Sequence, residues 1–527
     1  MPQINYTKEG GSILYDWHDW LSGVDFTGNV IDEGILGNSL ARSLQMDPLR
    51  NMGYLSMGKK AVDVTGVAQI DNYIRNGVVN NQSALMVSNG AKLQKATNLS
   101  STPAITNDGT FPHTISDGHA TPIGDDCTTY YVSATQYWFY SFNDATDWNV
   151  GRYDLTTTFD DDYMSTIPTN PLGSPYLTGG KGFPHPLQVA DDDILYMGDR
   201  NFVHAYDGQS NTFFAAVLTL PFGFIITSFA KTNDRKLAIG GYYTGPSGNT
   251  QPNLYEGKAL VWIWNLLDLD PDFSYDLHDN YVSEIRNWNG ELIAFTSGAG
   301  TLTFPAPSKL QILRGGNFVP LVQFANGIPI RGGVDVSQDE IYWSSVGVDS
   351  VASINSYTKN PYTGDYIYNY LTTGSGISAG MLKIFYGDSS PRLFVSSGAT
   401  TTGGLQTFTS GITSSTTVYL KTAYPSFPIL KRGTLTNVTI NFMTAVADGL
   451  PLTIQTLLDK SDQRSICAPI TDVSNLKQIV IQTDKDQLPL GNFTSLQPRI
   501  FWSQLAGVKT DAAVIESIKY DFDYINI

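Results

Sequence analysis

The chain has 527 residues, of which 41% are apolar and 15% are charged, so it can bury a large core and lacks the composition of a disordered protein. Its net charge is −17, and residues 412–527 hold ten basic and ten acidic side chains, so the acidic excess lies before them. An acidic surface disfavours specific nucleic-acid binding and attraction to anionic membranes. No window approaches 18 uninterrupted apolar residues, so no membrane insertion is expected.

The choice of acidic residue indicates a chain rich in turns. Only seven of the 49 acidic residues are Glu, so the other 42 are Asp. Asp favours turns over helix interiors because its short side chain competes for backbone hydrogen bonds. The 29 Tyr and 25 Phe favour pleated, half-buried surfaces. We therefore expect an all-β protein.

The first sixty residues do not share the pattern that follows. They have no basic segment followed by an apolar one, so no secretory leader is expected and the chain is expected to be made in a cytoplasm. At most one short helix is allowed by the apolar positions Ile31, Ile35, Leu40 and Leu44. The segment is rich in aromatic residues, but it has too little bulk to form a core of its own. These residues include Tyr15, Trp17, Trp20 and Phe26. We read residues 1–60 as an extended arm that packs on the propeller or docks on another subunit.

Residues 61–411 contain a degenerate repeat. Its clearest copy, residues 191–208, is two short apolar strands joined by a Gly/Asp/Asn turn and closed by Asp-Gly, which is typical of a β-hairpin. Related units recur at a mean spacing of about 51 residues, which suits the four-stranded blades of a β-propeller. The inner strands of these units are predicted to begin near Ala84, Tyr130, Ile194, Leu237, Leu292, Ile341 and Leu393.

The repeat predicts about seven blades around one axis, because a single twisted sheet cannot bury both faces while radially stacked sheets can. Such a ring must also close. We expect a strand from residues 60–70 to complete the last unit, near residues 380–410.

Residues 412–527 differ in pattern and predict a C-terminal antiparallel β-sandwich. Apolar and polar residues alternate strictly in residues 437–442 and 518–524. Residues 452–456, 477–483 and 499–502 bring the count to five or six strands. Because the last strand belongs to the predicted core, we expect removal of even ten C-terminal residues to be damaging.

The sequence carries no recognisable catalytic motif, and we predict no enzyme activity, no catalytic residues, no cofactor and no metal. The six His stand outside known motifs: His18, His113, His119, His185, His204 and His278. The two cysteines, Cys127 and Cys467, are too far apart in sequence for a disulfide framework or a zinc site and are expected to be free and buried.

Two Phe-Pro-His triplets end at His113 and His185. They precede successive repeat units, so we interpret them as loops leading into blades. The alternative is a pair of ligands on one face of the ring, but equivalent positions in adjacent blades would be too far apart to share one metal ion.

Acidic runs offer a weaker alternative, calcium binding. The runs are Asp160–Asp162 and Asp191–Asp193, with a group comprising Asp268, Asp270, Asp272 and Asp276. Most such runs are solvated turns, and the last group lacks the glycine and the terminal Glu of a calcium loop. Four aromatic residues could stack on sugars but are more often packing anchors: Trp138, Trp148, Trp288 and Trp343.

Residues 183–208 resemble the blade-opening pattern of propeller-bearing tail and collar proteins of tailed bacteriophages, and residues 516–524 are similar to their terminal strand. The resemblance implies a virion structural protein, assembled in the host cytoplasm: a symmetric ring in the tail, such as a nozzle, collar or tail tip. It also implies a cyclic homo-oligomer that contacts other virion proteins. Two alternatives are a carbohydrate-binding or glycan-processing propeller, such as a receptor-binding protein for host-surface glycans, and a cellular protein-interaction scaffold.

Overall fold

The structure is a computed structural model of the whole chain. The structure describes residues 5–6, 12–18, 40–44, 46–51, 54–57, 59–64, 77–80, 84–89, 91–116, 122–143, 148–167, 183–244, 257–298, 308–324, 329, 331–346, 352–359, 366–372, 380–386, 392–397, 404–412, 418–422, 431–443, 452–458, 462–465, 477–482, 496–502 and 515–526. They divide into two compact units. Unit 1 comprises residues 1–61, 354–374 and 408–527, and unit 2 comprises residues 62–353 and 375–407.

Strands dominate both units, which confirms the predicted all-β class. Within the described ranges the single α-helix, α1 (Tyr163–Thr166), has four residues, and no helix there could cross a membrane.

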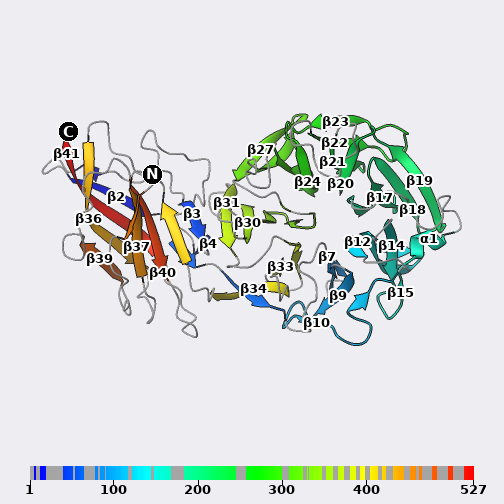
Figure 1. Cartoon of the computed structure of the whole chain (residues 1–527), viewed down its shortest axis with the longest axis horizontal. Helices are drawn as coiled ribbons and strands as arrows, with labels where there is room; N and C mark the ends of the chain where they lie inside the picture. The colour runs from blue at the N-terminus through cyan, green and yellow to red at the C-terminus, as the bar shows by residue number, and fades with distance from the viewer. Residues whose placement is uncertain are drawn as a thin grey trace. The chain divides into compact units, whose positions relative to one another are not determined.

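Seven antiparallel sheets follow one another along the described part of the chain and surround a common centre (Figure 1). The first three comprise β7 (Gly77–Asn80), β8 (Ala84–Asn89), β9 (Lys92–Thr97) and β10 (Ala104–Ile105), with β11 (His113–Thr114) against β9; β12 (Ile123–Val132), β13 (Thr135–Asn143), β14 (Trp148–Tyr153) and β15 (Phe159–Asp160); and β16 (Leu187–Val189), β17 (Leu195–Asp199), β18 (Phe202–Asp207) and β19 (Thr212–Thr219).

The other four comprise β20 (Phe224–Lys231), β21 (Leu237–Tyr243), β22 (Lys258–Trp264) and β23 (Phe273–Asp276); β24 (Tyr281–Trp288), β25 (Glu291–Ser297), β26 (Ser308–Arg314) and β27 (Asn317–Phe324); β28 (Val334–Val336), β29 (Glu340–Val346), β30 (Ala352–Lys359) and β31 (Tyr366–Thr372); and β32 (Leu382–Phe385), β33 (Arg392–Ser397), β34 (Gly404–Ile412) and β6 (Lys59–Asp63). Each sheet runs in chain order from its first strand outward, except that β6 joins the last sheet from the N-terminal side. This is the β-propeller predicted from the repeat.

Ring closure is visible in two features. The Val64 amide donates to the Leu405 carbonyl at 2.8 Å, directly after β6, which confirms the predicted closing strand. A buried apolar cluster also joins the last sheet to the first, with Phe394 and Leu405 packed in the same cluster as Leu85 and Val87. The first and last sheets therefore bury their faces against each other, as stacked blades must.

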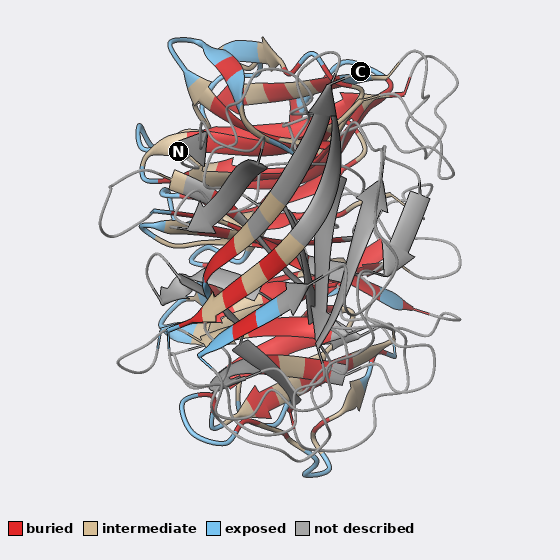
Figure 2. Cartoon of the chain, turned by 90° about the vertical axis from the view of Figure 1, so that its left-hand side faces the viewer, coloured by how far each residue is buried: buried red, intermediate tan, exposed pale blue. Residues whose placement is uncertain are grey.

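Aromatic packing fills the spaces between successive sheets, as between β12–β15 and β16–β19. There Phe139 and Trp148 share a cluster with Leu195, Met197 and Tyr206. In Figure 2 the buried residues follow the strands, while exposed residues gather in turns. Alternating large side chains from facing sheets thus provide the core of each junction.

Unit 1 contains two further sheets. One has the order β1 (Asn5–Tyr6), β2 (Ser12–His18), β41 (Ile515–Asn526), β36 (Lys431–Phe442) and β39 (Gln478–Gln482), with β5 (Tyr54–Met57) against β41 and β4 (Met46–Asn51) against β5. The other has the order β3 (Leu40–Leu44), β35 (Val418–Thr422), β40 (Leu496–Trp502), β37 (Leu452–Leu458) and β38 (Asp462–Ser465). The strands expected after residue 412 are present; their arrangement as a sandwich stays a prediction.

The structure differs from the expected separate arm at residues 1–60. Strands β1, β2 and β3 are members of these two sheets, β5 pairs with β41, and β4 pairs with β5. The pairing of β2 with β41 runs residue by residue from Ser12 with Asp523 to His18 with Ser517. The segment lacks bulk for a core of its own, and pairing with C-terminal strands satisfies its backbone groups instead. The possible helix lies outside the described residues except at residues 40–44, which form β3.

Candidate functional site

The first strands of the seven sheets surround an axial cavity of about 220 Å³. Its walls come from β7, β12, β16, β20, β24 and β32 and from the segment before β28. The charged side chains in the lining are Asp126, Glu284, Arg286, Arg331 and Lys383. A cluster of five charges at the centre of an apolar fold is costly unless the groups are paired, so their contacts define the site.

A β-bulge recurs in three of these first strands. The pairing register shifts between Gly124 and Asp126 in β12, between Ile226 and Ser228 in β20, and between Val282 and Glu284 in β24. A bulge inserts one extra residue and re-aims the side chains beside it. The residue that follows each shift is polar and faces the next sheet.

These polar side chains accept backbone N–H groups of the following sheet. Asp126 Oδ2 accepts from the Leu187 amide at 2.9 Å, and Glu284 Oε2 accepts from the Gly332 amide at 2.9 Å. The same contact occurs from the Ile285 amide to Ser228 Oγ at 2.8 Å and from the Ile384 amide to Asp335 Oδ2 at 2.7 Å. Four sheet junctions are thus joined at the axis by a side-chain-to-backbone hydrogen bond.

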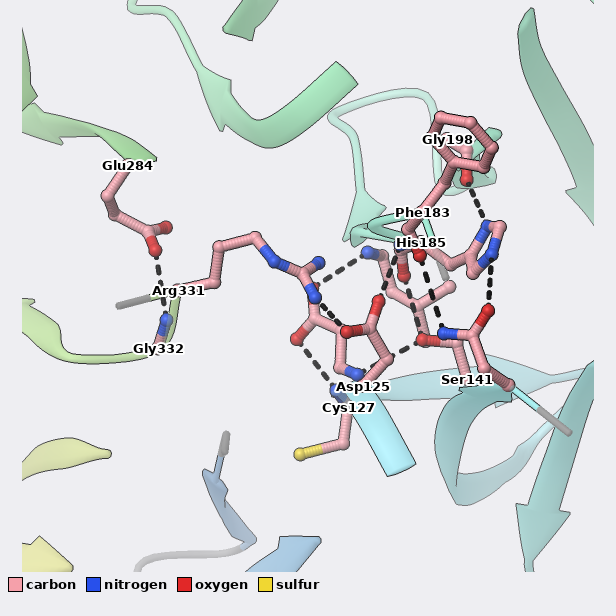
Figure 3. Close-up of polar contacts among 12 residues, drawn as sticks. Asp125, Cys127, Ser141, Phe183, His185, Gly198, Glu284, Arg331 and Gly332 are labelled. Atoms are coloured by element: carbon pink, nitrogen blue, oxygen red, sulfur yellow. Dashed lines mark hydrogen bonds and ion pairs between the residues drawn. The ribbon is translucent and has the colours of Figure 1, made fainter. Parts of the chain in front are cut away.

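Asp125 is the centre of a second network, drawn in Figure 3. Its carboxylate accepts the His185 backbone N–H at 2.5 Å and pairs with the Arg331 guanidinium. The His185 ring lies flat on Trp148, with 4.1 Å between ring centroids, and its nitrogens contact the Gly198 carbonyl and the Asn143 amide oxygen, each at 3.1 Å. Asp125, a residue that is 2% exposed, therefore connects its own sheet to the segments that lead into two other sheets.

The basic side chains of the cavity keep some accessibility, whereas two of their acidic partners are buried. Arg286 Nη1 lies 2.6 Å from Glu284 Oε1, with side chains 23% and 3% exposed. Arg331 and Asp125 are 17% and 1% exposed. Lys383 Nζ is 3.9 Å from Asp335 Oδ1, with both side chains about one-fifth exposed. Three of the five charged side chains in the cavity wall are therefore basic, and each is paired with a carboxylate.

Burial dominates the protonation of the acidic groups in this site. It raises the pKa of Asp126 to about 7, with the nearby negative charge of Glu284 adding to the effect. The pKa of Glu284 is also raised by burial, against the opposing effect of Arg286. Asp126 is thus a carboxyl group that changes charge near neutral pH.

We expect Asp126→Asn to flatten the dependence of stability on pH between about 4 and 7. Below that range Asp126 is protonated in both states; within it the unfolded chain releases the proton that the folded chain retains, so stability falls as pH rises. The full effect is at most about 4 kcal/mol, from about 1.4 kcal/mol per pKa unit. Urea denaturation at several pH values measures it, with the exposed Asp270→Asn as the control. An unchanged slope in Asp126→Asn would contradict the assignment.

The two Phe-Pro-His triplets have different environments. His185 leads into β16 beside the axis, as a loop into a sheet was expected to do. His113 belongs to β11, and its Nε2 lies 3.0 Å from both oxygens of Asp161, which also accepts the Tyr140 hydroxyl. Its ring stacks on Phe159 at 3.7 Å. The structure therefore places the two histidines in separate contacts.

Most of the acidic runs lie in turns, but Asp160 ends β15 and Asp276 ends β23. In the 191–193 run, Asp192 accepts the Ile194 amide and the Tyr196 hydroxyl, and Lys231 pairs with Asp191. In the later group, Asp272 pairs with Lys236 and Asp276 with Lys258. Among the described residues, no group of three or more His, Cys, Asp or Glu side chains is placed to hold a metal ion.

The interpretation of the tryptophans as packing anchors is confirmed. Trp138, Trp148 and Trp343 have no exposed surface, and Trp288 is 4% exposed. They cannot form a sugar platform in this conformation.

The remaining histidines and cysteines are dispersed. His204 is buried, which lowers its pKa to about 4, and His278 is exposed in a turn. Cys127 is a free, buried thiol in the cavity wall. His18 lies in β2, while His119 and Cys467 lie outside the described residues.

Sequence reasoning missed the charged side chains at the axis. Glu284 and Arg286 flank Ile285 in β24, and Lys383 separates Leu382 from Ile384 in β32. A charge beside apolar residues of a strand, as in β24 and β32, was the available signal, because buried charges need a structural or functional reason.

No protein-family model and no curated protein sequence matches this chain. Similar solved structures include a catalytically inactive virginiamycin B lyase from Staphylococcus aureus with quinupristin (10% identity, 66% of this chain and 99% of that chain, TM-score 0.44). Another is the extracellular domain of a putative hybrid two-component system from B. thetaiotaomicron (11% identity, 97% and 67%, TM-score 0.43). A third is the PQQ-bound aldose sugar dehydrogenase from Streptomyces coelicolor (12% identity, 66% and 97%, TM-score 0.34). By its sheets, this chain is a β-propeller protein.

The prediction that the chain is not an enzyme is corrected by these comparisons. A lyase and a dehydrogenase are among the structures of similar fold. Function depends on the site rather than on the fold, so a propeller without familiar motifs does not exclude catalysis.

Proposed function

We propose that this chain is a structural component of a tailed-phage particle and that its copies associate through the propeller rim. The observation that carries the proposal is a pair of leucines at the tip of the β22–β23 turn. Leu267 is 87% exposed and Leu269 is 82% exposed. Large, adjacent exposed apolar side chains are typical of interaction sites.

Hydrogen bonds hold this tip in one conformation. Asn265 Oδ1 accepts the amides of Leu267 and Asp268, each at 2.9 Å, and its side-chain amide donates to Asp268 and Asp272. The Trp264 indole donates to the Asp268 carbonyl at 2.6 Å. A preorganised tip loses little entropy when it binds, and burying a leucine contributes about 1.5–3 kcal/mol.

The charge around the tip supports association with a less acidic surface. Residues 265–276 contain four Asp, of which Asp272 and Asp276 pair with lysines outside the segment. Asp268 and Asp270 flank Leu269 with negative charge, so two such tips repel each other. Residues 412–527 balance ten basic with ten acidic side chains and are the less acidic part of another copy. We therefore propose a head-to-tail contact, which closes into a ring when the rotation permits.

Substitution of both leucines by serine is expected to abolish association while leaving the unfolding temperature unchanged, because neither side chain contributes to the core. The mass of the wild type and of the Leu267→Ser/Leu269→Ser variant in solution, with electron microscopy of the wild type, measures this. The matched control is Phe222→Ser, at an exposed apolar residue in the turn between β19 and β20, outside the proposed contact. A wild type that stays a monodisperse monomer under all conditions would overturn the proposal.

Two other functions predict different experimental results. A carbohydrate-binding propeller binds a glycan array, and a cellular scaffold remains a monomer that recruits other proteins. Portal, capsid or terminase genes beside the coding gene support the phage assignment, and their absence counts against it.

A further inference from the structure

The axial cavity brings three cationic groups to one surface. Arg286 lies on β24, Arg331 precedes β28 and Lys383 lies on β32, so three successive sheets each contribute one. Each side chain is between 17% and 23% exposed. Guanidinium and ammonium groups with this access can bind a ligand without leaving their present partners.

The buried carboxylates stand behind two of these cations. Glu284 and Asp125 are at most 3% exposed, and each also accepts a backbone N–H, so both are held in place. The ion pairs with Glu284 and Asp125 orient the Arg286 and Arg331 side chains. In Figure 3 the Arg331 side chain extends between Glu284 and the Asp125 network.

We propose that the axial cavity binds a small oxyanion, with a carboxylate or phosphate group held by Arg286, Arg331 and Lys383. Arginine matches the planar geometry of carboxylate and phosphate oxygens, and lysine adds a point charge. The cavity volume of about 220 Å³ is enough to hold a small oxyanion.

Asp126 makes this binding depend on pH. Its carboxyl group shares the cavity wall with Glu284, Arg286, Arg331, Lys383 and the Cys127 thiol, while Asp125 and Asp335 lie behind the wall. Because its pKa is about 7, it is mostly neutral at pH 6 and mostly charged at pH 8. The ionised form repels an anion, whereas the protonated form can donate a hydrogen bond to it.

Titration calorimetry of the full chain tests the proposal with inorganic phosphate and succinate as probes, and with ethylammonium and propane-1,2-diol as cationic and neutral controls. We expect saturable binding of phosphate, succinate or both. Between pH 6 and pH 8 the affinity should fall about tenfold more than it does in Asp126→Asn, in which only the ionisation of the probe itself remains. Phosphate alone or succinate alone identifies which oxyanion group the cavity takes. Binding of neither, or equal binding of ethylammonium, would overturn the proposal.

Two variants locate the binding. Lys383→Gln should weaken it by about tenfold or more, the effect of losing one charge-assisted hydrogen bond. Lys258→Gln, which removes an exposed lysine paired with Asp276 away from the cavity, should leave it unchanged. Asp126→Asn should keep the binding and lose the part of its pH dependence that Asp126 contributes. Circular dichroism verifies that each variant is folded, and unaltered affinity in folded Lys383→Gln would refute the site.

Discussion

Deletion of residues 515–527 is expected to unfold the sheet that contains β2 and β36. Strand β41 lies between these two strands and pairs with β36 over nearly its whole length and with β2 over residues 517–523. Its Ile515 and Ile518 have no exposed surface, as do Val438 and Ile440 of β36. Removing the strand leaves two open edges and exposes an apolar face, losses far larger than one substitution produces.

Hydrogen exchange followed by mass spectrometry measures this effect. We expect residues 431–442 to lose protection, while the sheets of unit 2 that contain no strand of this segment, such as β20–β23, keep theirs. The matched control deletes Ile527 alone, which lies beyond β41. Full protection of β36 after the longer deletion would show that β41 is not required.

Asp125→Ala is expected to destabilise the propeller by about 3–5 kcal/mol, the cost of leaving a buried charge without its partner. The substitution removes the carboxylate that pairs with Arg331 and accepts the His185 backbone N–H. Denaturation by urea measures the loss, and Asp270→Ala, at an exposed turn position, is expected to change stability by less than about 0.5 kcal/mol.

A double substitution separates the ion pair from other effects. Adding Arg331→Met to Asp125→Ala removes the uncompensated charge and should restore part of the lost stability. If the double variant is as unstable as the sum of the two single variants, the pairing between Asp125 and Arg331 does not account for the loss.

The hairpins of the propeller could be predicted from the sequence, but in most sheets the second strand was taken for the innermost one. The starts expected for inner strands at Leu237, Leu292 and Ile341 fall in the second strands β21, β25 and β29. The true first strands are often short, as in β16 and β28, and several carry bulges. Such segments lack the regular alternation that marks a strand, whereas the second and third strands form a regular hairpin.

The candidate site was harder to predict because it depends on contacts between segments that are far apart in the sequence. Asp125 and Arg331 are 206 positions apart, and only the closed ring brings them together. Asp126 stands in a β-strand like many other aspartates of this chain, and nothing local marks its burial. The Phe-Pro-His triplets looked alike in sequence, yet His185 reaches the axis while His113 contacts Asp161 in a different part of the propeller.

The strand that closes the propeller also determines when the ring can form during synthesis. Val64 meets Leu405, so the ribosome must produce some 340 residues between the two halves of this junction. Until then the apolar side chains of the first sheet, including Leu85 and Val87, lack the partners that later cover them. Bringing together such distant segments is slow, and the waiting sheet edges favour aggregation. A nascent chain of this protein is therefore most vulnerable just before its last sheet emerges.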